Sequence, residues 1–131
     1  MENRLRAQLI DWLRADPALA EINAIEEESP VAASTPWLGI AASASTDWGT
    51  KDRAGREVRI ALELESRSDE PDADADLLAA IERRVLDLPS PQAGFEVASI
   101  RFLRARSEAR AHNLRGGLLE FRFRILEPNQ E

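Results

Sequence analysis

The chain has 131 residues, no cysteine, a single histidine (His112) and a formal net charge of −7. This length fits one domain with a sizeable core and is too short for two. The missing cysteines exclude disulfides and thiolate metal sites, one imidazole disfavours a zinc site, and the acidic balance argues against binding nucleic acid through a basic surface.

The N-terminus predicts an amphipathic helix over residues 3–15. Its apolar face repeats every three or four residues and consists of Leu5, Leu9, Trp12 and Leu13, with Ile10 at its margin. We expect Asn3 to cap this helix and Asp16-Pro17 to end it. No apolar run approaches the length of a membrane span, so we expect no membrane partner and a protein made and kept in the cytoplasm.

The clearest strand is predicted at residues 58–66. Its apolar side chains occupy every second position, at Val58, Ile60, Leu62 and Leu64. Successive side chains of an extended chain point to opposite faces, so one face of this strand enters a core. A weaker strand with small residues on both faces is predicted at 37–45, and Ile25 is compatible with a further short strand. The polar connection 48–55 predicts a hairpin with a long, mobile tip.

An acidic segment, residues 68–76, leads into a second helix at 77–88. The buried side of this helix is predicted to consist of Leu77, Leu78, Ile81, Val85, Leu86 and Leu88. Acids before the first turn complement the positive end of the helix dipole. The EF-hand order of oxygens and its central glycine are missing, so we assign the acids a structural role over a calcium or magnesium site. Pro89 ends the helix, and a turn at 90–94 follows.

A third long strand is predicted at residues 95–106. Its inward side chains are expected to be Ala98, Ile100 and Phe102. The alternation breaks at Leu103, which predicts a β-bulge there.

The last strand follows a polar hairpin connection, residues 108–117, in which Gly116-Gly117 is expected to serve the turn. It alternates strictly, with apolar side chains at Leu119, Phe121, Phe123 and Ile125. A polar tail, 129–131, closes the chain.

These elements predict an α+β fold with an antiparallel sheet of four to five strands and both helices packed on its apolar face. Antiparallel sheets tolerate one wet face, which accounts for the one-sided strands. The other face is charged, and we expect it to be solvated or to meet a partner. Its charged residues include Arg59, Glu63, Glu65, Arg122 and Arg124.

The sequence contains no credible active site. It has no P-loop, no dinucleotide-binding glycine pattern and no nucleophile elbow. His112 is predicted to be an exposed loop residue. Asp47 and Asp52 flank Trp48, but nothing in a hairpin tip would desolvate them and shift a pKa. We therefore expect no enzyme, no cofactor and no metal.

Two tryptophans lie outside the predicted helices. Trp48 either folds back on its own sheet or anchors another protein, since aromatic side chains dominate interface hot spots. Trp37, which directly follows Pro36, is expected in the core or at the edge of the sheet.

Several short motifs resemble one protein family. The central ones are residues 46–52 (Thr-Asp-Trp-Gly-Thr-Lys-Asp) and 55–58 (Gly-Arg-Glu-Val), which precede the alternating strand. Supporting positions are Leu13 to Leu19, Pro36-Trp37, the helix 77–88 and Phe121 to Arg124. Together they resemble the tail-completion, or tail-terminator, proteins of long-tailed phages and of the related gene transfer agents.

The resemblance implies a structural subunit that forms a ring, usually sixfold, on the head-proximal end of the tail tube. Its partners would be further copies of itself, the tail tube protein and a head connector or stopper protein, while DNA passes through the channel without specific binding. Assembly would take place in the bacterial cytoplasm, and the finished protein would sit at the head–tail junction.

The resemblance also suggests which residues make contacts. The predicted subunit or tube interface consists of Ser45, Thr46, Asp47, Trp48, Gly49, Thr50, Lys51 and Asp52. The charged sheet face named above is predicted either to line the channel or to form a salt-bridged seam. The alternative function is a stand-alone protein–protein adaptor domain unrelated to tails.

Overall fold

The computed structural model describes residues 1–128, so the predicted polar tail lies outside the described residues. Along the chain its elements are α1 (Glu2–Arg14), the 3-10 helix η1 (Pro17–Leu19), β1 (Ala24–Glu26), β2 (Trp37–Asp47), β3 (Gly55–Arg67), α2 (Ala75–Leu86), β4 (Pro91–Gln92), β5 (Phe95–Ala109), the 3-10 helix η2 (Ala111–Asn113) and β6 (Leu114–Leu126). The predicted order of two helices and four long strands is confirmed.

The strands form a six-stranded sheet in the order β1-β2-β3-β6-β5-β4. All neighbours are antiparallel except β1 and β2, which are parallel. The predicted sheet of four to five antiparallel strands is therefore wrong in strand number and in one direction. β4 falls in the predicted turn and pairs only with Phe95 and Glu96, which is too short for a periodic pattern. β1 is parallel to β2 because residues 27–36 return the chain to the end of the sheet where β1 begins.

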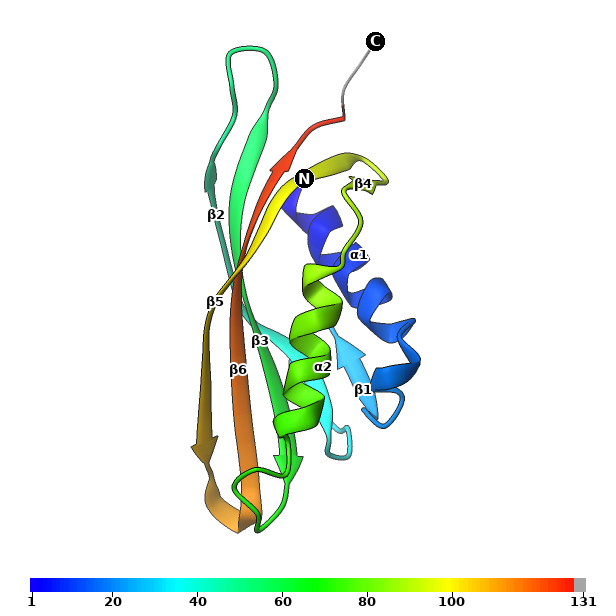
Figure 1. The fold of residues 1–131 in the computed structure, drawn as a ribbon, viewed down its shortest axis with the longest axis vertical. Coiled ribbons are helices and arrows are strands. Elements are labelled where there is room, and N and C mark those ends of the chain that lie inside the picture. The colour runs from blue at the N-terminus through cyan, green and yellow to red at the C-terminus, as the bar shows by residue number, and fades with distance from the viewer. Residues whose placement is uncertain (129–131) are drawn as a thin grey trace.

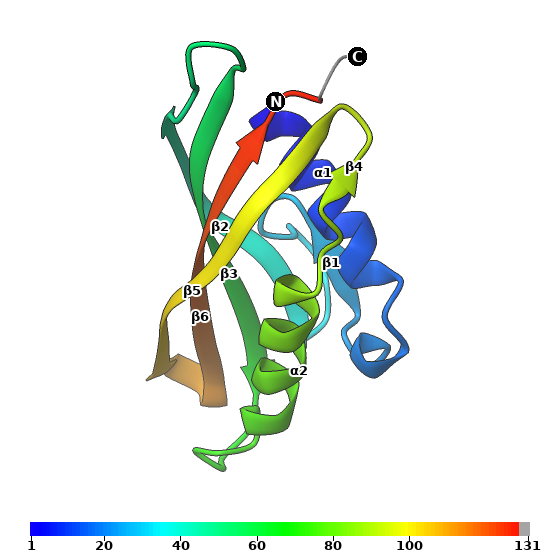
Figure 2. The ribbon, with the colours of Figure 1, turned by 45° about the horizontal axis from the view of Figure 1, so that its top comes forward.

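Both helices cover the same face of the sheet (Figure 1). Figure 2 shows α1 and α2 beside each other on that face. The core lies between the two layers, and its largest fully buried side chains are Phe95, Phe121, Phe123, Leu5, Leu9, Ile10, Leu13, Leu19, Leu38, Ile60, Leu62 and Leu64. The opposite side, here called the helix-free face, carries the odd-numbered side chains of β3 from Glu57 to Glu65 and the even-numbered residues of β6 from Gly116 to Arg124.

Helix α1 forms as the apolar pattern predicts, but its cap differs. The helix begins at Glu2 with Met1 in the N-cap position and no side-chain cap. Asn3 lies within the first turn, where its side chain accepts a hydrogen bond from Arg6, so the predicted cap is wrong. The predicted end at Asp16-Pro17 is confirmed, and the Asp16 carboxylate there accepts a hydrogen bond from a backbone N–H of η1.

Helix α2 ends earlier than the sequence predicts. Its last residue is Leu86, which is 41% exposed and does not belong to the buried side as expected. Leu88 lies beyond the helix and is still buried. At the other end, Asp74 occupies the N-cap position and accepts a hydrogen bond from the Ser66 hydroxyl of β3. One acid of the predicted lead-in thus binds the sheet.

A β-bulge in β5 changes which side chains face the core. The register with β6 shifts between Val97 and Ser99, so Ala98 is exposed and its predicted inward orientation is wrong. Val97 is buried instead. Ile100 and the following Phe102 pack against the core as predicted.

Two further bulges lie in the long outer strands. A second shift in β5 confirms the bulge predicted near Leu103. In β2 the register shifts between Ile40 and Ala42, which moves Ser43 to the helix side of the sheet. There the Ser43 hydroxyl accepts a hydrogen bond from Arg6 of α1 at 3.1 Å.

The hairpin between β5 and β6 is tighter than predicted, because both strands extend into residues 108–117. Its turn uses left-handed backbone at His112 (φ 61°) and Asn113 (φ 62°). Gly116-Gly117 lies inside β6 and does not serve the turn. A Cβ on the second glycine would lie only 2.9 Å from a methyl carbon of Leu78, so glycine lets α2 approach the sheet closely.

Trp12 and Arg84 tie the two helices together. The Trp12 indole N–H donates to the Arg84 carbonyl oxygen at 2.7 Å. The Arg84 guanidinium donates back to the Trp12 carbonyl oxygen through Nε at 2.9 Å and Nη2 at 2.7 Å. Its central carbon also lies 3.3 Å from the centroid of the indole ring, in a cation–π contact. Trp12 therefore bridges the helices in addition to covering the core.

We predict that Arg84→Ala lowers the free energy of unfolding by about 1 to 3 kcal/mol, because charge-assisted hydrogen bonds and the ring contact are lost. Arg83→Ala is the matched control, since Arg83 is the exposed neighbour in the same helix. It should change stability by less than about 0.5 kcal/mol. Chemical denaturation measures both, and equal losses in the two variants would show that the bridge adds no stability.

Candidate interaction surfaces

The predicted contact loop forms the far end of the hairpin between β2 and β3. Ser45 to Asp47 belong to the end of β2 and pair with Arg56 to Val58 of β3. Beyond them the chain closes on itself, because the Thr50 N–H donates to the Arg53 carbonyl oxygen at 2.8 Å. In Figure 1 this hairpin extends past the helices at one end of the molecule. The loop residues Gly49, Thr50, Lys51 and Asp52 are all exposed.

Trp48 lies at the base of this tip and is half-buried. Its backbone N–H donates to the Gly55 carbonyl oxygen at 3.1 Å. The central carbon of the Arg124 guanidinium lies 5.4 Å from the centroid of the indole ring. Trp48 is not part of the buried core cluster. The ring thus rests against β6 with part of its surface open.

Arg53 fastens the same hairpin to the neighbouring strands. Its guanidinium lies 3.0 Å from the Glu96 carboxylate of β5 and also donates to the Glu127 carbonyl oxygen. The base of the hairpin is therefore held at the sheet while residues 49–52 stay exposed.

Trp37 has a different environment. It is 8% exposed and lies on the helix-free face, where its indole N–H donates to the Glu65 carboxylate at 3.0 Å. β1 and β3 pair with it on either side. Trp37 is therefore a buried structural residue, but it lies outside the main core cluster and between two paired strands, so its predicted location in the core or at the sheet edge is wrong.

The helix-free face contains an ion-pair cluster around Arg110. Its guanidinium lies 2.7 Å from a Glu63 oxygen, 3.0 Å from Glu65 and 2.8 Å from Glu108. The group fits there because Gly116 has no side chain, since a Cβ would lie 2.3 Å from the guanidinium carbon. Arg110 could not be predicted from the sequence as a face residue, because it lies in a turn and takes part in no periodic pattern.

The Arg110 cluster shifts two pKa values. Partial burial of the Arg110 guanidinium opposes its charge, but hydrogen bonds to Glu108, Glu63 and Glu65 outweigh this effect and raise its pKa. The hydrogen bond from Arg110 lowers the pKa of Glu108 below its ordinary value. Both shifts come from ion pairing, and neither group is poised for proton transfer near neutral pH.

Three arginines form a row across the middle of this face. Arg59 of β3 is directly opposite Arg122 of β6, which is directly opposite Arg101 of β5. Like charges in directly opposed positions of a sheet are unfavourable. Glu57 offsets part of this charge, with one oxygen 3.1 Å from Nε of Arg124 and 3.9 Å from Nε of Arg122. The predicted face residues therefore fall into two groups, one around Arg110 and one along this row.

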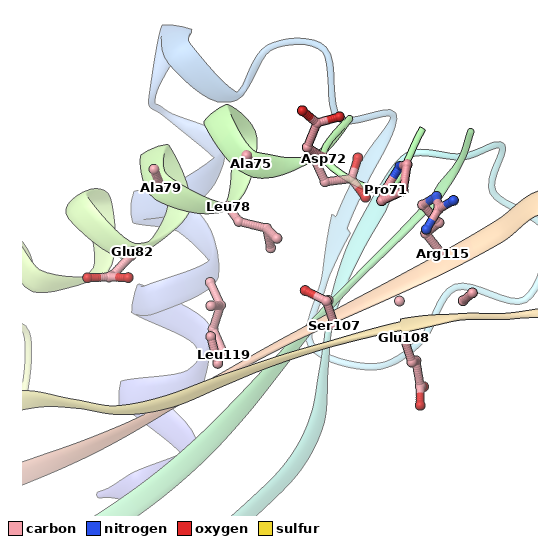
Figure 3. A pocket seen from close by; sticks show the side chains of 15 residues that line it. Pro71, Asp72, Ala75, Leu78, Ala79, Glu82, Ser107, Glu108, Arg115 and Leu119 are labelled. Carbon is pink, nitrogen blue, oxygen red and sulfur yellow. The ribbon is translucent and has the colours of Figure 1, made fainter. Parts of the chain in front are cut away.

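A groove of about 620 Å³ lies between α2 and the hairpin ends of β5 and β6 (Figure 3). Leu78 and Leu119 form much of its apolar wall, and Glu82 lies at its rim. Arg115 is engaged with backbone, since it donates to the Ser68 carbonyl oxygen at 2.9 Å. The groove therefore offers an apolar surface with scattered charges and no converging set of catalytic groups.

Neither a metal site nor a membrane-spanning helix occurs within residues 1–128. In that range no group of three or more His, Asp or Glu side chains is arranged to hold a metal ion. The helices in the same range are all too short or too polar to cross a membrane.

The exposed hairpin and the ion-paired, helix-free sheet face are therefore the two candidate interaction surfaces of this fold. The family model described as "Tail completion protein gp17" matches residues 7–126. The chain belongs to this family, so the resemblance predicted from the short motifs is confirmed. It is a structural tail protein and not an enzyme.

Comparison with individual proteins adds a structural match. A chain in the solved structure "Virion of native gene transfer agent (GTA) particle" superposes with a TM-score of 0.77. The match covers 95% of this chain and 96% of that chain at 19% sequence identity, which shows a shared fold. No curated protein sequence matches the chain.

We predict that Arg110→Gln lowers the free energy of unfolding by about 1 to 3 kcal/mol, because three neighbouring carboxylates lose their shared cation. The lowered pKa of Glu108 means that its contribution is present above the ordinary glutamate pKa and is lost as the pH falls through the lowered value.

Denaturation at several pH values tests both parts. Arg110→Gln should remove the share of acid sensitivity that Glu108 contributes. Arg106→Gln is the control, because Arg106 is 65% exposed and lies 3.9 Å from Glu108. If both variants behaved like the unmodified protein, the Arg110 cluster would have no role in stability.

Proposed function

We propose that the protein caps the head-proximal end of a tail tube as a ring, stops tube polymerisation and joins the tail to the head connector or stopper protein. The family match over residues 7–126 is the observation that carries this proposal. The fold shared with a chain of a gene transfer agent virion supports it. The ring assembles in the bacterial cytoplasm and then remains at the head–tail junction, with DNA passing through its centre.

The hairpin tip is assigned to contacts with a neighbouring subunit or with the tail tube protein. Gly49 to Asp52 are exposed at one end of the molecule, and the hairpin base is held by Arg53. Trp48 presents a rigid aromatic surface that its own chain leaves partly open. Such a residue loses little conformational freedom on binding and commonly contributes much of the binding energy.

The helix-free face is assigned to the channel. Its carboxylates Glu63 and Glu65 are bound by Arg110, and Arg122 and Arg124 are drawn to Glu57. Among the five predicted face residues, Arg59 has no ion pair within residues 1–128. Four of the five predicted face residues are thus paired inside one chain and have little to offer a neighbouring subunit, which favours a channel lining over a salt-bridged seam. They also allow DNA to pass without being held at many phosphates.

Deletion of the gene tests the proposed function most directly. Electron microscopy of particles from the deletion strain should show filled heads without tails and free tubes of excessive length. Expression of the intact gene in the same strain should restore tailed particles. Normal particles with tails of normal length in the deletion strain would contradict the proposal.

Trp48→Ala tests the assignment of the hairpin. The isolated protein should remain folded, while assembly should weaken by about 2 kcal/mol or more for each contact. Trp37→Ala provides the contrast, because loss of a buried indole should destabilise the isolated protein by about 3 to 5 kcal/mol. Thermal unfolding and sedimentation of both variants distinguish these effects. A large loss of thermal stability in Trp48→Ala would identify Trp48 as a folding residue.

A further inference from the structure

Both outer long strands of the sheet have a free edge. β1 pairs only with Trp37 to Gly39 of β2, and β4 pairs only with the first two residues of β5. Residues 40–47 of β2 and 98–109 of β5 make no backbone hydrogen bond on their outer sides within the described part of the chain. These two segments are called the β2 edge and the β5 edge below. Each presents a row of open peptide groups that another strand can pair with.

The β2 edge has a bulge at its start and the charged Asp47 at its end, but the stretch between them is unprotected. Residues 41–46 read Ala-Ala-Ser-Ala-Ser-Thr, and all are exposed. Residues 41–46 contain no charge and no proline, which are two of the devices that prevent edge pairing. Its register with β3 is regular from Ala42 to Asp47. A long, exposed, uncharged edge of this kind suits pairing with a second strand.

The β5 edge contains a matching regular segment. After its second bulge, β5 keeps an even register with β6 from Arg104 to Ala109. This segment has the same length as the regular part of the β2 edge. Its side chains alternate between arginine or glutamate on the helix-free face and Ala105, Ser107 and Ala109 on the helix side.

The directions of the strands also fit. β2, β3, β6 and β5 are successively antiparallel, so β2 and β5 run in opposite directions at the two sides of the sheet. When one copy is rotated about an axis along the strands, its β5 edge meets the β2 edge of the next copy as another antiparallel pair. With an odd number of these strands the junction would be parallel. Such a contact joins two different surfaces and can close into a ring.

We propose that the β2 edge of one copy pairs with the β5 edge of the next and continues the sheet from subunit to subunit. This inference deepens the proposed function by naming the contact that forms the ring. The two regular segments lie at different heights along the sheet, so their pairing staggers adjacent copies. A stagger of this kind is required when a sheet closes on itself.

Side-chain sizes at the junction are complementary. In the registers that keep the helix-free faces of both copies on the same side, Ala44 of one copy lies beside Arg104 or Arg106 of the next. The small residues of the β2 edge leave room for these long side chains, and no arginine meets another across the junction. With Ala44 beside Arg106, Ser43 meets Ser107 and Ser45 meets Ala105 on the helix side. The helices remain on one side of the continued sheet, so the helix-free faces of all copies form one surface.

Cysteine cross-linking tests the pairing in a chain that has no cysteine of its own. Ala44→Cys is combined with Arg106→Cys or, one register step along, with Arg104→Cys. Mild oxidation of the purified protein and of assembled particles should give a ladder of linked multimers in at least one combination. Ala44→Cys with Arg83→Cys is the control, because Arg83 lies on α2, and this pair should give no ladder.

The pattern of products separates the alternatives. Linked dimers from Ala44→Cys alone would show that two β2 edges pair with each other and would overturn the proposal. The absence of a ladder from both combinations in assembled protein would also overturn it.

Hydrogen exchange provides a second test without substitutions. The outward-pointing amides in 42–47 and 104–109 should exchange roughly tenfold or more slowly in the assembled protein, since only these open groups gain ladder hydrogen bonds. Residues 79–83 of α2 serve as the internal control and should not change. Protection confined to the β2 edge, or absent from both edges, would contradict the pairing.

The outcomes distinguish this inference from the proposed function. If the purified protein gives a ladder but the deletion strain makes normal tails, the edge pairing is supported and the role in tails is contradicted. If the deletion strain makes tailless heads but assembled particles give no ladder, the role in tails is supported and the edge pairing is contradicted.

Discussion

The structure depends on the full-length ladder between β3 and β6. These central strands pair from Gly55 to Arg67 and are covered by helices on one side only. Because side chains alternate, the same ladder places fully buried residues such as Ile60 and Phe121 on one face and charges on the other. Each such buried side chain contributes roughly 1.5 to 3 kcal/mol. The core therefore needs only one layer of helices, which leaves the helix-free face and the outer strands available for contacts.

The sequence predicts the parts of this fold that rest on uninterrupted periodicity. α1, β3 and β6 follow single patterns over their length, and their buried faces are as expected. The wrongly predicted positions lie where a β-bulge or the end of a helix interrupts the periodic pattern. The shift after Val97 exposes Ala98, and α2 ends before Leu88. The short strand expected at Ile25 is confirmed as β1, but its parallel pairing and the two-residue strand β4 depend on tertiary contacts that leave no periodic signal.

The candidate surfaces were predictable to a smaller extent. The loop around Trp48 could be recognised because an aromatic residue between polar and glycine residues has no periodic reason to be buried. Arg110 could not, because its position over Gly116 requires the left-handed turn that folds the chain back. The arginine row requires the register among three strands, which alternation within each strand does not contain. In both cases the contact depends on which distant segments pair with each other, and the pattern within a single segment does not contain this.

The net charge of −7 and the open strand edges act on association in opposite directions. Unpaired edges favour contact between any two copies, including open-ended chains when the contact does not close. Mutual repulsion slows the approach of like-charged copies, and salt screens it over about 8 Å at physiological ionic strength. The acidic surface therefore provides colloidal stability to newly made subunits. Low ionic strength should keep them dispersed, and rising ionic strength should shorten the time before they associate.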